Sequence, residues 1–266
     1  MSDRMDALKN AKRIVIKVGS STLTHDTGNI NLRRVETLVR VLADLRHEGK
    51  EIVLVSSGAI AVGIGRLGVP SDKRGTKEKQ AYSAIGQSEL MGIYGRIFAE
   101  YGCSVAQILL TKNVLDDSVR KENAVNAFQT LLDWGVIPIV NENDAIATEE
   151  IEFGDNDTLS AVVASLIGAQ LLIILSDIDG LYSADPHTSK DAKLVTQVDE
   201  ITDELLSTAG GAGSKRGTGG MVTKLLAARH ATAHGIHMVI TNGKDPRGIY
   251  AVLDGQEVGT LFCAKG

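Results

Sequence analysis

Residues 13–21 read Arg13-Ile14-Val15-Ile16-Lys17-Val18-Gly19-Ser20-Ser21, an apolar strand that carries a lysine near its end and runs directly into a glycine turn. A second glycine-rich run, Gly217-Thr218-Gly219-Gly220-Met221-Val222-Thr223-Lys224, opens a helix and also ends on a lysine. Glycines let backbone N–H groups approach phosphate oxygens, and a helix N-terminus adds a favourable dipole. An ammonium group beside each turn supplies positive charge where phosphate charge shifts during transfer. Together the two turns predict phosphoryl transfer, which neither predicts alone.

Outward from the first strand, apolar runs of strand length alternate with longer helical patterns. This alternation is typical of a mainly parallel sheet covered by helices on both faces. Strands are predicted at residues 14–18, 52–55, 105–110, 136–140, 171–175 and 237–240. Helices are predicted at residues 32–48, 59–67, 79–101, 117–134, 158–167 and 221–234. The predicted fold class is a three-layer α/β/α sandwich, one compact domain (1–266) with two lobes.

The composition excludes several classes of protein. With 266 residues and 43% of them apolar, the chain can bury a substantial core. A net charge of −5 argues against nucleic acid as the main partner, because that needs concentrated basic surface. No apolar run has membrane-spanning length, and residues 1–12 lack a signal segment. Cys103 and Cys263 have no metal-binding spacing, so a reduced cytoplasmic protein with free thiols is expected.

Several short motifs suggest other functions, but their surroundings argue against each. Residues 63–68 (Gly-Ile-Gly-Arg-Leu-Gly) match the spelling of a dinucleotide fingerprint, yet they follow a predicted helix rather than a strand. The phosphate-loop ending Gly-Lys-Ser/Thr is absent, because Gly49-Lys50 and Gly243-Lys244 are followed by acidic residues. The three histidines within residues 230–237 lack the glutamate of a zinc-protease motif and are predicted to be surface or cap residues. No metal site made by the protein is predicted.

Some connecting segments are expected to be irregular. Residues 71–79 are predicted to form a charged surface loop, and residues 209–217 are too glycine-rich to hold a fixed shape before nucleotide binds. Residues 141–153 suggest a hairpin over the sheet, and Asp179-Gly180 is a hairpin-turn signal. The helix at 79–101 carries an apolar stripe typical of core or of a subunit interface. The stripe consists of Ala81, Ala84, Ile85, Leu90, Ile93 and Ile97.

Polar clusters follow three of the predicted strands, and ligands of open parallel sheets bind at the carboxyl ends of strands. The amides after Ser57, in Ser56-Ser57-Gly58-Ala59, suit a carboxylate or a transferring phosphoryl group, although an ordinary N-cap serine explains them too. Residues 141–144 (Asn-Glu-Asn-Asp) and 154–157 (Gly-Asp-Asn-Asp) suit an amino-acid head group. N-capping explains residues 155–157 about equally well. Ser176-Asp177 follows the most apolar strand and is predicted to form the floor of a nucleotide pocket.

With these residues in place, the chain resembles the amino-acid kinase family. The matching segments, in order along almost the whole chain, are residues 16–20, 55–61, 139–145, 154–157, 176–177, 180–186, 217–224 and 258–262. The motif pair at 141–144 and 154–157 favours a member that phosphorylates L-glutamate over sister kinases for carbamate, aspartate, acetylglutamate or uridylate. Many bacterial relatives carry a further C-terminal RNA-binding-like (PUA) domain, whereas this sequence ends at Gly266, so a kinase-only form is expected.

The resemblance implies roles for individual residues. The N-terminal lobe, about 10–170, would bind glutamate, and the C-terminal lobe, about 171–266, would bind ATP. Catalytic roles fall to Lys17, Lys224 and Asp157, with the two lysines stabilising the transferring phosphoryl group and Asp157 orienting them. Glutamate-binding roles fall to Ser57, Gly58, Asp144 and Asn156. The residues implied around ATP are Lys17, Ser176, Asp177, Thr218, Gly219, Gly220, Met221, Val222, Thr223 and Lys224.

The resemblance also implies a reaction and its partners. ATP and L-glutamate would give ADP and γ-glutamyl phosphate in the first step of proline biosynthesis, with Mg²⁺ held largely by ATP and water. Proline would inhibit by competing at the glutamate site, and the family together with the apolar stripe favours a homodimer or homotetramer. Two alternatives stay open: a sister kinase for another acid or phosphate, and a nucleotide-binding regulator without catalysis.

Overall fold

The structure is a computed structural model that describes residues 2–25, 27–68, 75–111, 114, 117–146, 156–186, 189, 191–209 and 220–265. The chain divides into two compact units by its internal contacts. Unit 1 comprises Met1–Lys17 and Gly154–Gly266, and unit 2 comprises Val18–Phe153. The described residues hold no helix with both the length and the apolarity needed to cross a membrane.

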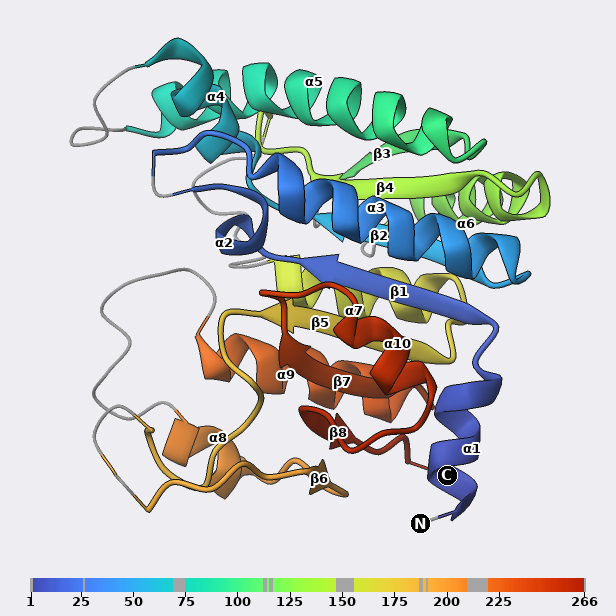
Figure 1. Cartoon of the computed structure of the whole chain (residues 1–266), viewed down its shortest axis with the longest axis vertical. Coiled ribbons are helices and arrows are strands. Elements are labelled where there is room, and N and C mark those ends of the chain that lie inside the picture. Colours follow the sequence, from blue (N-terminus) through green and yellow to red (C-terminus); the bar gives the residue numbers. More distant parts are fainter. Residues whose placement is uncertain are drawn as a thin grey trace. The chain divides into compact units, whose positions relative to one another are not determined.

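Unit 2 contains a layer of three parallel strands in the order β3-β4-β2. The strands are β2 (Glu51–Ser56), β3 (Val105–Leu110) and β4 (Ile137–Glu142), and the helices are α2 (Ser20–Leu23), α3 (Leu32–His47), α4 (Ala59–Leu67), α5 (Thr76–Glu100) and α6 (Ser118–Asp133). Helix α3 packs against β2, α5 against β3 and α6 against β4. Figure 1 shows α3 in front of these strands and α6 behind them, so helices cover both faces.

Capping residues account for the ends of three helices in unit 2. Asn31 caps α3 by accepting a hydrogen bond from the Arg34 amide, and Asp117 caps α6 through the amides of Val119 and Arg120. Helix α4 ends at Gly68, whose φ of +63° is the left-handed conformation that glycine adopts without strain.

Unit 1 contains five strands in the order β1-β5-β7-β8-β6. They are β1 (Arg13–Val18, with Lys17 the last residue in this unit), β5 (Leu171–Ser176), β6 (Gln197–Val198), β7 (His237–Asn242) and β8 (Thr260–Phe262). Strands β5 and β7 run parallel, whereas β8 runs antiparallel to β7. All six residues of β5 are buried, as a central strand requires.

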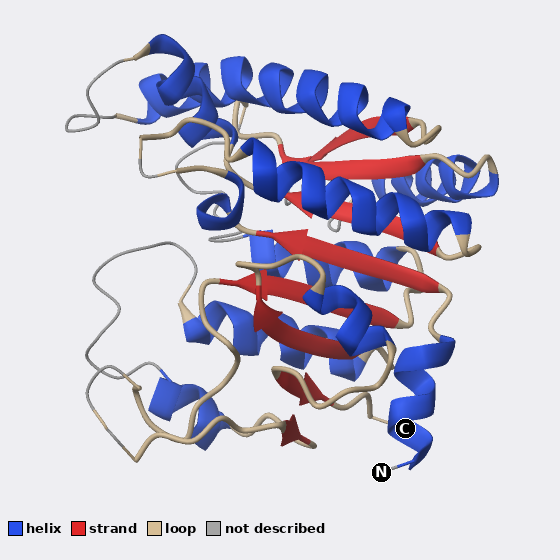
Figure 2. Ribbon diagram, in the orientation of Figure 1, coloured by secondary structure: helices blue, strands red, loops and turns tan. Residues whose placement is uncertain are grey.

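The helices of unit 1 are α1 (Ser2–Asn10), α7 (Asn156–Leu166), α8 (Asp203–Ala209), α9 (Met221–Ala233) and α10 (Gly248–Leu253). Helices α7 and α9 pack closely on each other, and they contact β5 and β7 respectively. Figure 2 shows them behind the strands, with α10 in front, so this layer too is covered on both faces. The predicted fold class is therefore confirmed.

Other predictions about elements need correction. Helices α1, α2, α8 and α10 and strands β6 and β8 were not among the predicted elements, because each is short or lacks a long apolar pattern. Helix α5 starts at Thr76, so the predicted loop is helical from there, and its residues 71–74 lie outside the described part. The predicted stripe on α5 is not its buried face: Ala81, Ala84 and Ile85 are exposed, and only Leu90 and Ile93 of the stripe are buried.

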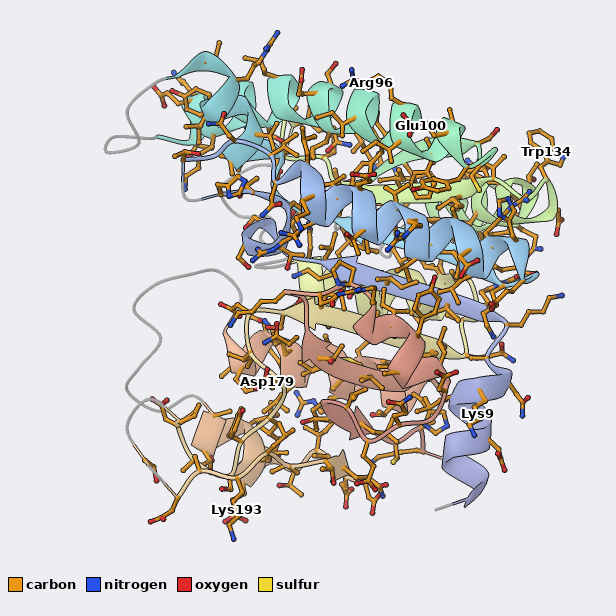
Figure 3. The ribbon with its side chains drawn as sticks, in the orientation of Figure 1. Lys9, Arg96, Glu100, Trp134, Asp179 and Lys193 are labelled. Carbon is orange, nitrogen blue, oxygen red and sulfur yellow. The ribbon has the colours of Figure 1, made fainter. Side chains whose placement is uncertain are left out.

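The predicted hairpin turn at Asp179-Gly180 is also wrong. Residues 177–180 form a bend after β5, and the carboxylate of Asp179 (Figure 3) accepts hydrogen bonds from Asn242 and Tyr182 at 2.7 and 3.0 Å. A Cβ at Gly180 would lie 2.5 Å from the Thr260 hydroxyl, so glycine is required here by close packing. Within residues 141–153, Asp144–Ile146 form a turn, and residues 147–153 lie outside the described part.

Candidate active site

Two lysines from opposite ends of the sequence meet at one carboxylate in unit 1. The Lys17 ammonium lies 2.7 Å from Oδ1 of Asp157, and the Lys224 ammonium lies 3.0 Å from Oδ2. Asp157 is completely buried, and the two lysine side chains are 6% and 7% exposed. Cations this deeply buried need a counter-charge, which Asp157 supplies to both. The predicted convergence of Lys17 and Lys224 is thus a feature of the structure.

Three elements position these side chains. Lys17 stands at the end of β1, Asp157 in the first turn of α7, and Lys224 in the first turn of α9. Because α7 and α9 pack along each other, their N-terminal turns lie side by side. The hydroxyl of Thr223 adds a weaker contact to Asp157 Oδ2 at 3.5 Å and donates to the carbonyl of Gly220 at 2.8 Å.

The N-terminus of α9 suits an anion. Its N-cap residue is Gly220, in extended conformation (φ −67°, ψ 176°), and glycine offers no side chain to cap the amides that follow. Met221, Val222 and Thr223 are half-buried at this end of the helix. Two further predicted ATP-binding residues, Thr218 and Gly219, lie outside the described residues.

Ser176 and Asp177 follow β5 in the same unit. Ser176 is buried and donates a hydrogen bond to the Asp177 carboxylate at 3.1 Å, while Asp177 itself is exposed. The carbonyl of Ser176 accepts from the amide of Gly243, just after β7, at 2.7 Å. These contacts hold the carboxyl ends of β5 and β7 together, where a nucleotide site of an open parallel sheet is expected.

In unit 2, Ser57 and Gly58 connect β2 to α4. Gly58 is the N-cap of α4 with φ +95°, and it provides no side-chain cap. The Ser57 amide donates to the carbonyl of Val18 at 3.1 Å, and a Cβ at Gly58 would lie 3.5 Å from Cβ of Ser20. The left-handed conformation, more than crowding, therefore favours glycine. This helix start, like that of α9, suits an anionic group.

Asp144 lies after β4 in unit 2, in a half-buried position. Burial raises the pKa of its carboxyl, and a hydrogen bond of 3.0 Å from the Ser83 hydroxyl partly offsets that rise. A nearby cation stabilises the ionised form of a partly desolvated carboxylate, so Asp144 suits a ligand ammonium group. Asn156 is the one predicted glutamate-binding residue that belongs to unit 1. It is the first residue of α7 and is half-buried.

Comparison with protein families decides the classification. Residues 12–242 match the model described as "Amino acid kinase family". The chain belongs to this family.

Individual relatives of this amino acid kinase are similar over nearly their full length. A protein from Clostridium perfringens named glutamate 5-kinase is 55% identical over 263 residues, covering 97% of this chain and 98% of that protein. Proteins of the same name from Clostridium acetobutylicum and Listeria innocua are 54% and 52% identical, and the matches cover 99% and 96% of them.

Solved structures share the fold at low identity. A UMP kinase from Bacillus anthracis has a TM-score of 0.65 and 18% identity, with 96% of this chain and 97% of that chain covered. An isopentenyl phosphate kinase from T. acidophilum has a TM-score of 0.64 and 17% identity, with 94% and 99% covered. These likenesses support the amino acid kinase fold and do not identify the substrate.

A kinase implies ATP and commonly Mg²⁺, and the described residues fit the nucleotide better than they fit a metal ion. Lys17, Lys224 and the uncapped start of α9 suit phosphate oxygens. Both oxygens of Asp157 face lysines, and no group of three His, Cys, Asp or Glu side chains among the described residues has metal-binding geometry.

Sequence reasoning missed several polar residues of this amino acid kinase. Ser83, Gln87 and Tyr94 lie on the buried face of α5, and each makes a hydrogen bond with the end of a strand or the turn after it. Their spacing of four and seven residues is close to one and two helical turns, with Leu90 between them. This helical spacing could have identified the buried face of α5, but the prediction considered only the apolar residues of the helix.

Other predicted features have simple structural explanations. Cys103 and Cys263 are both buried, and neither forms a disulfide among the described residues. Gly63 and Gly65 lie inside α4 and Gly68 ends it, so residues 63–68 are not a dinucleotide fingerprint. His234 caps the end of α9, while burial lowers the pKa of His230, which lies 3.1 Å from the Ser165 hydroxyl and is half-buried rather than at the surface.

Proposed function

We propose that this chain transfers the γ-phosphoryl group of ATP to the γ-carboxylate of L-glutamate, giving ADP and γ-glutamyl phosphate, the first step of proline biosynthesis. The observation that carries the proposal is the meeting of Lys17 and Lys224 at Asp157. The relatives named glutamate 5-kinase, at 52–55% identity, support L-glutamate as the acceptor.

The chemistry needs no general base. A glutamate side chain has an ordinary pKa near 4.3, so its carboxylate is already ionised at neutral pH. The barrier arises from bringing one anion up to a polyanion, and catalysis consists of positioning and charge neutralisation. Two ammonium groups at one point meet that requirement. Lys17 and Lys224 stabilise the transferring group, and Asp157 holds both of them in place.

The remaining residues have binding roles in this proposal. Ser176, Asp177 and residues 218–224 hold ATP in unit 1. Asp144 pairs with the α-ammonium of glutamate, because a half-buried carboxylate with a raised pKa gains from a cationic partner. Ser57, Gly58 and Asn156 take the carboxylates of the substrate through backbone amides and a side-chain amide.

A substrate panel tests the proposal. Purified protein is mixed with MgATP and, in separate reactions, L-glutamate, L-aspartate, acetylglutamate, carbamate or UMP, while ADP release is followed and hydroxylamine traps any acyl phosphate. We expect ADP and hydroxamate with L-glutamate alone. Equal or greater turnover of another acceptor would identify a sister kinase, and ATP binding without ADP release in any reaction would identify a regulator.

Two further parts of the proposal concern control and assembly. Proline competes at the glutamate site, so millimolar proline raises the KM for glutamate; an activity insensitive to proline would contradict this. The protein forms a homodimer or homotetramer, which light scattering measures directly, and a monomer at assay concentration would refute it.

A further inference from the structure

Helix α5 connects three separate segments of unit 2 through polar side chains. Ser83 donates to the carboxylate of Asp144 at 3.0 Å, and Gln87 accepts from the side-chain amide of Asn141 at 2.9 Å. The phenol of Tyr94 lies 3.0 Å from the hydroxyl of Ser56. A single face of one helix therefore contacts the end of β2, the end of β4 and the turn after β4.

The Gln87–Asn141 and Tyr94–Ser56 contacts are buried and the Ser83–Asp144 contact is part-buried, which makes them costly to break. Ser83, Gln87 and Tyr94 are 3%, 8% and 1% exposed, and Asn141 and Ser56 are both 2% exposed. A buried polar group that loses its partner bears the full desolvation penalty, so each pair fixes the position of both members. Burial raises the pKa of Tyr94, whose phenol is therefore neutral and available for the hydrogen bond with Ser56.

The backbone of α5 is also locked to α4. A Cβ added at Gly86 would overlap the carbonyl oxygen of Ala59, and one added at Gly63 would overlap the carbonyl oxygen of Tyr82. These two glycines thus let the helix backbones touch. Ala59 is the first residue of α4, directly after Ser57 and Gly58, so the anion-binding helix start is fixed against α5.

We infer that α5 is a positioning element for the amino-acid substrate, with Ser83 setting the orientation of Asp144 and Tyr94 setting that of the segment at Ser56 and Ser57. This inference rests on the proposed function, because it assigns Asp144 and Ser57 to glutamate. Ser83 and Tyr94 act through those residues and do not themselves touch the reacting atoms. Loss of either hydroxyl weakens glutamate binding and leaves ATP binding and phosphoryl transfer nearly unchanged.

The test is a split between kinetic constants. In Ser83→Ala we expect the KM for glutamate to rise about tenfold, the scale of a lost hydrogen bond to a charged group. The KM for ATP and the kcat stay within about twofold. Ser88→Ala is the matched control, because Ser88 lies on the exposed face of the same helix, and it should change neither KM. Ser83→Thr restores a hydroxyl and should recover part of the lost affinity.

Tyr94→Phe provides a second, independent variant that keeps the buried ring. We expect the KM for glutamate to rise about threefold, with Tyr101→Phe at the end of α5 as the control. If Ser83→Ala fails to fold in urea denaturation, Tyr94→Phe decides. An unchanged glutamate KM in the folded variants, or equal changes in both KM values, would overturn the positioning role. A wild-type protein that releases no ADP with glutamate would overturn the proposed function and this inference with it.

Discussion

Two aspartates, one in each unit, are held in opposite ways. Asp157 in unit 1 is fully buried between two ammonium groups. Asp144 in unit 2 is half-buried, receives one hydrogen bond from a neutral hydroxyl, and has a raised pKa. The first carboxylate has its counter-charges within the protein. The second has a weaker partner, which leaves it suited to a cation brought by a ligand.

Within the proposed function, this difference corresponds to different roles for the two aspartates. Asp157 holds the two lysines that would act on phosphate, so its role is to keep charge at a fixed place. In that function Asp144 binds the substrate, and desolvation destabilises its ionised form, as is common for residues of functional sites. A change at Asp157 should therefore affect folding and catalysis, whereas a change at Asp144 should affect the affinity for one substrate.

The largest effect is expected from Asp157→Asn. Removing the charge leaves two buried lysines without their shared counter-ion, and breaking a buried ion pair costs about 3–5 kcal/mol. Urea denaturation should show a decrease of this size in the free energy of unfolding. Asp203→Asn is the matched control, because Asp203 forms an exposed ion pair with Arg229 and its loss should cost under about 1 kcal/mol. An equal decrease in the free energy of unfolding in both variants would show that Asp157 contributes no more to stability than a surface carboxylate does.

Lys17→Ala and Lys224→Ala should each lower the kcat at least ~100-fold, because each removes a preorganised donor to the transition state. Steady-state kinetics with saturating ATP and glutamate measure the effect. Lys193→Ala is the control in the same unit, since Lys193 (Figure 3) is exposed. A near-normal kcat in both lysine variants would show that the cluster is structural only.

Asp144→Ala should raise the KM for glutamate about tenfold or more, while the KM for ATP changes little. Asp133→Ala, on the exposed end of α6, is the control and should leave both constants unchanged. An altered KM for ATP with a normal KM for glutamate would contradict the assignment of Asp144 to the glutamate site.

The smallest effect concerns stability and pH. The folded-state pKa of Asp144 is raised above its ordinary value, so its ionisation opposes folding as the pH rises through and above that range. Asp144→Asn should therefore be slightly more stable than wild type at pH 7, with the advantage shrinking as the pH falls toward 4. Urea denaturation at pH 7, 6 and 5 measures the trend. An advantage that grows on acidification would mean that the pKa is lowered instead.

The sequence predicted the framework of both units well because apolar residues make up half or more of each of the six long strands. It failed on β6 and β8, with two and three residues, and on the short helix α10, whose burial depends on neighbours distant in sequence. Helix α5 failed for another reason. Its buried face includes Ser83 and Gln87, which are buried because polar partners at the ends of strands satisfy them.

The candidate site was predictable in part. The apolar runs placed Lys17, Ser57 and Ser176 correctly at or just after strand ends, where ligands of open parallel sheets bind. The distances from Lys17 and Lys224 to Asp157 depend on the packing of α7 against α9, which no local pattern encodes. The roles of these residues stay predictions until the variants are measured.

The contact between Gly63 and Gly86 has a mechanical consequence. With 25 residues, α5 is about 37 Å long, and its backbone meets that of α4 at Tyr82 and Gly86, in the first half of the helix. Because Leu90, Tyr94 and Phe98 further along the helix are also buried, α5 is held along its length, and a larger side chain at Gly63 or Gly86 would displace it as a whole.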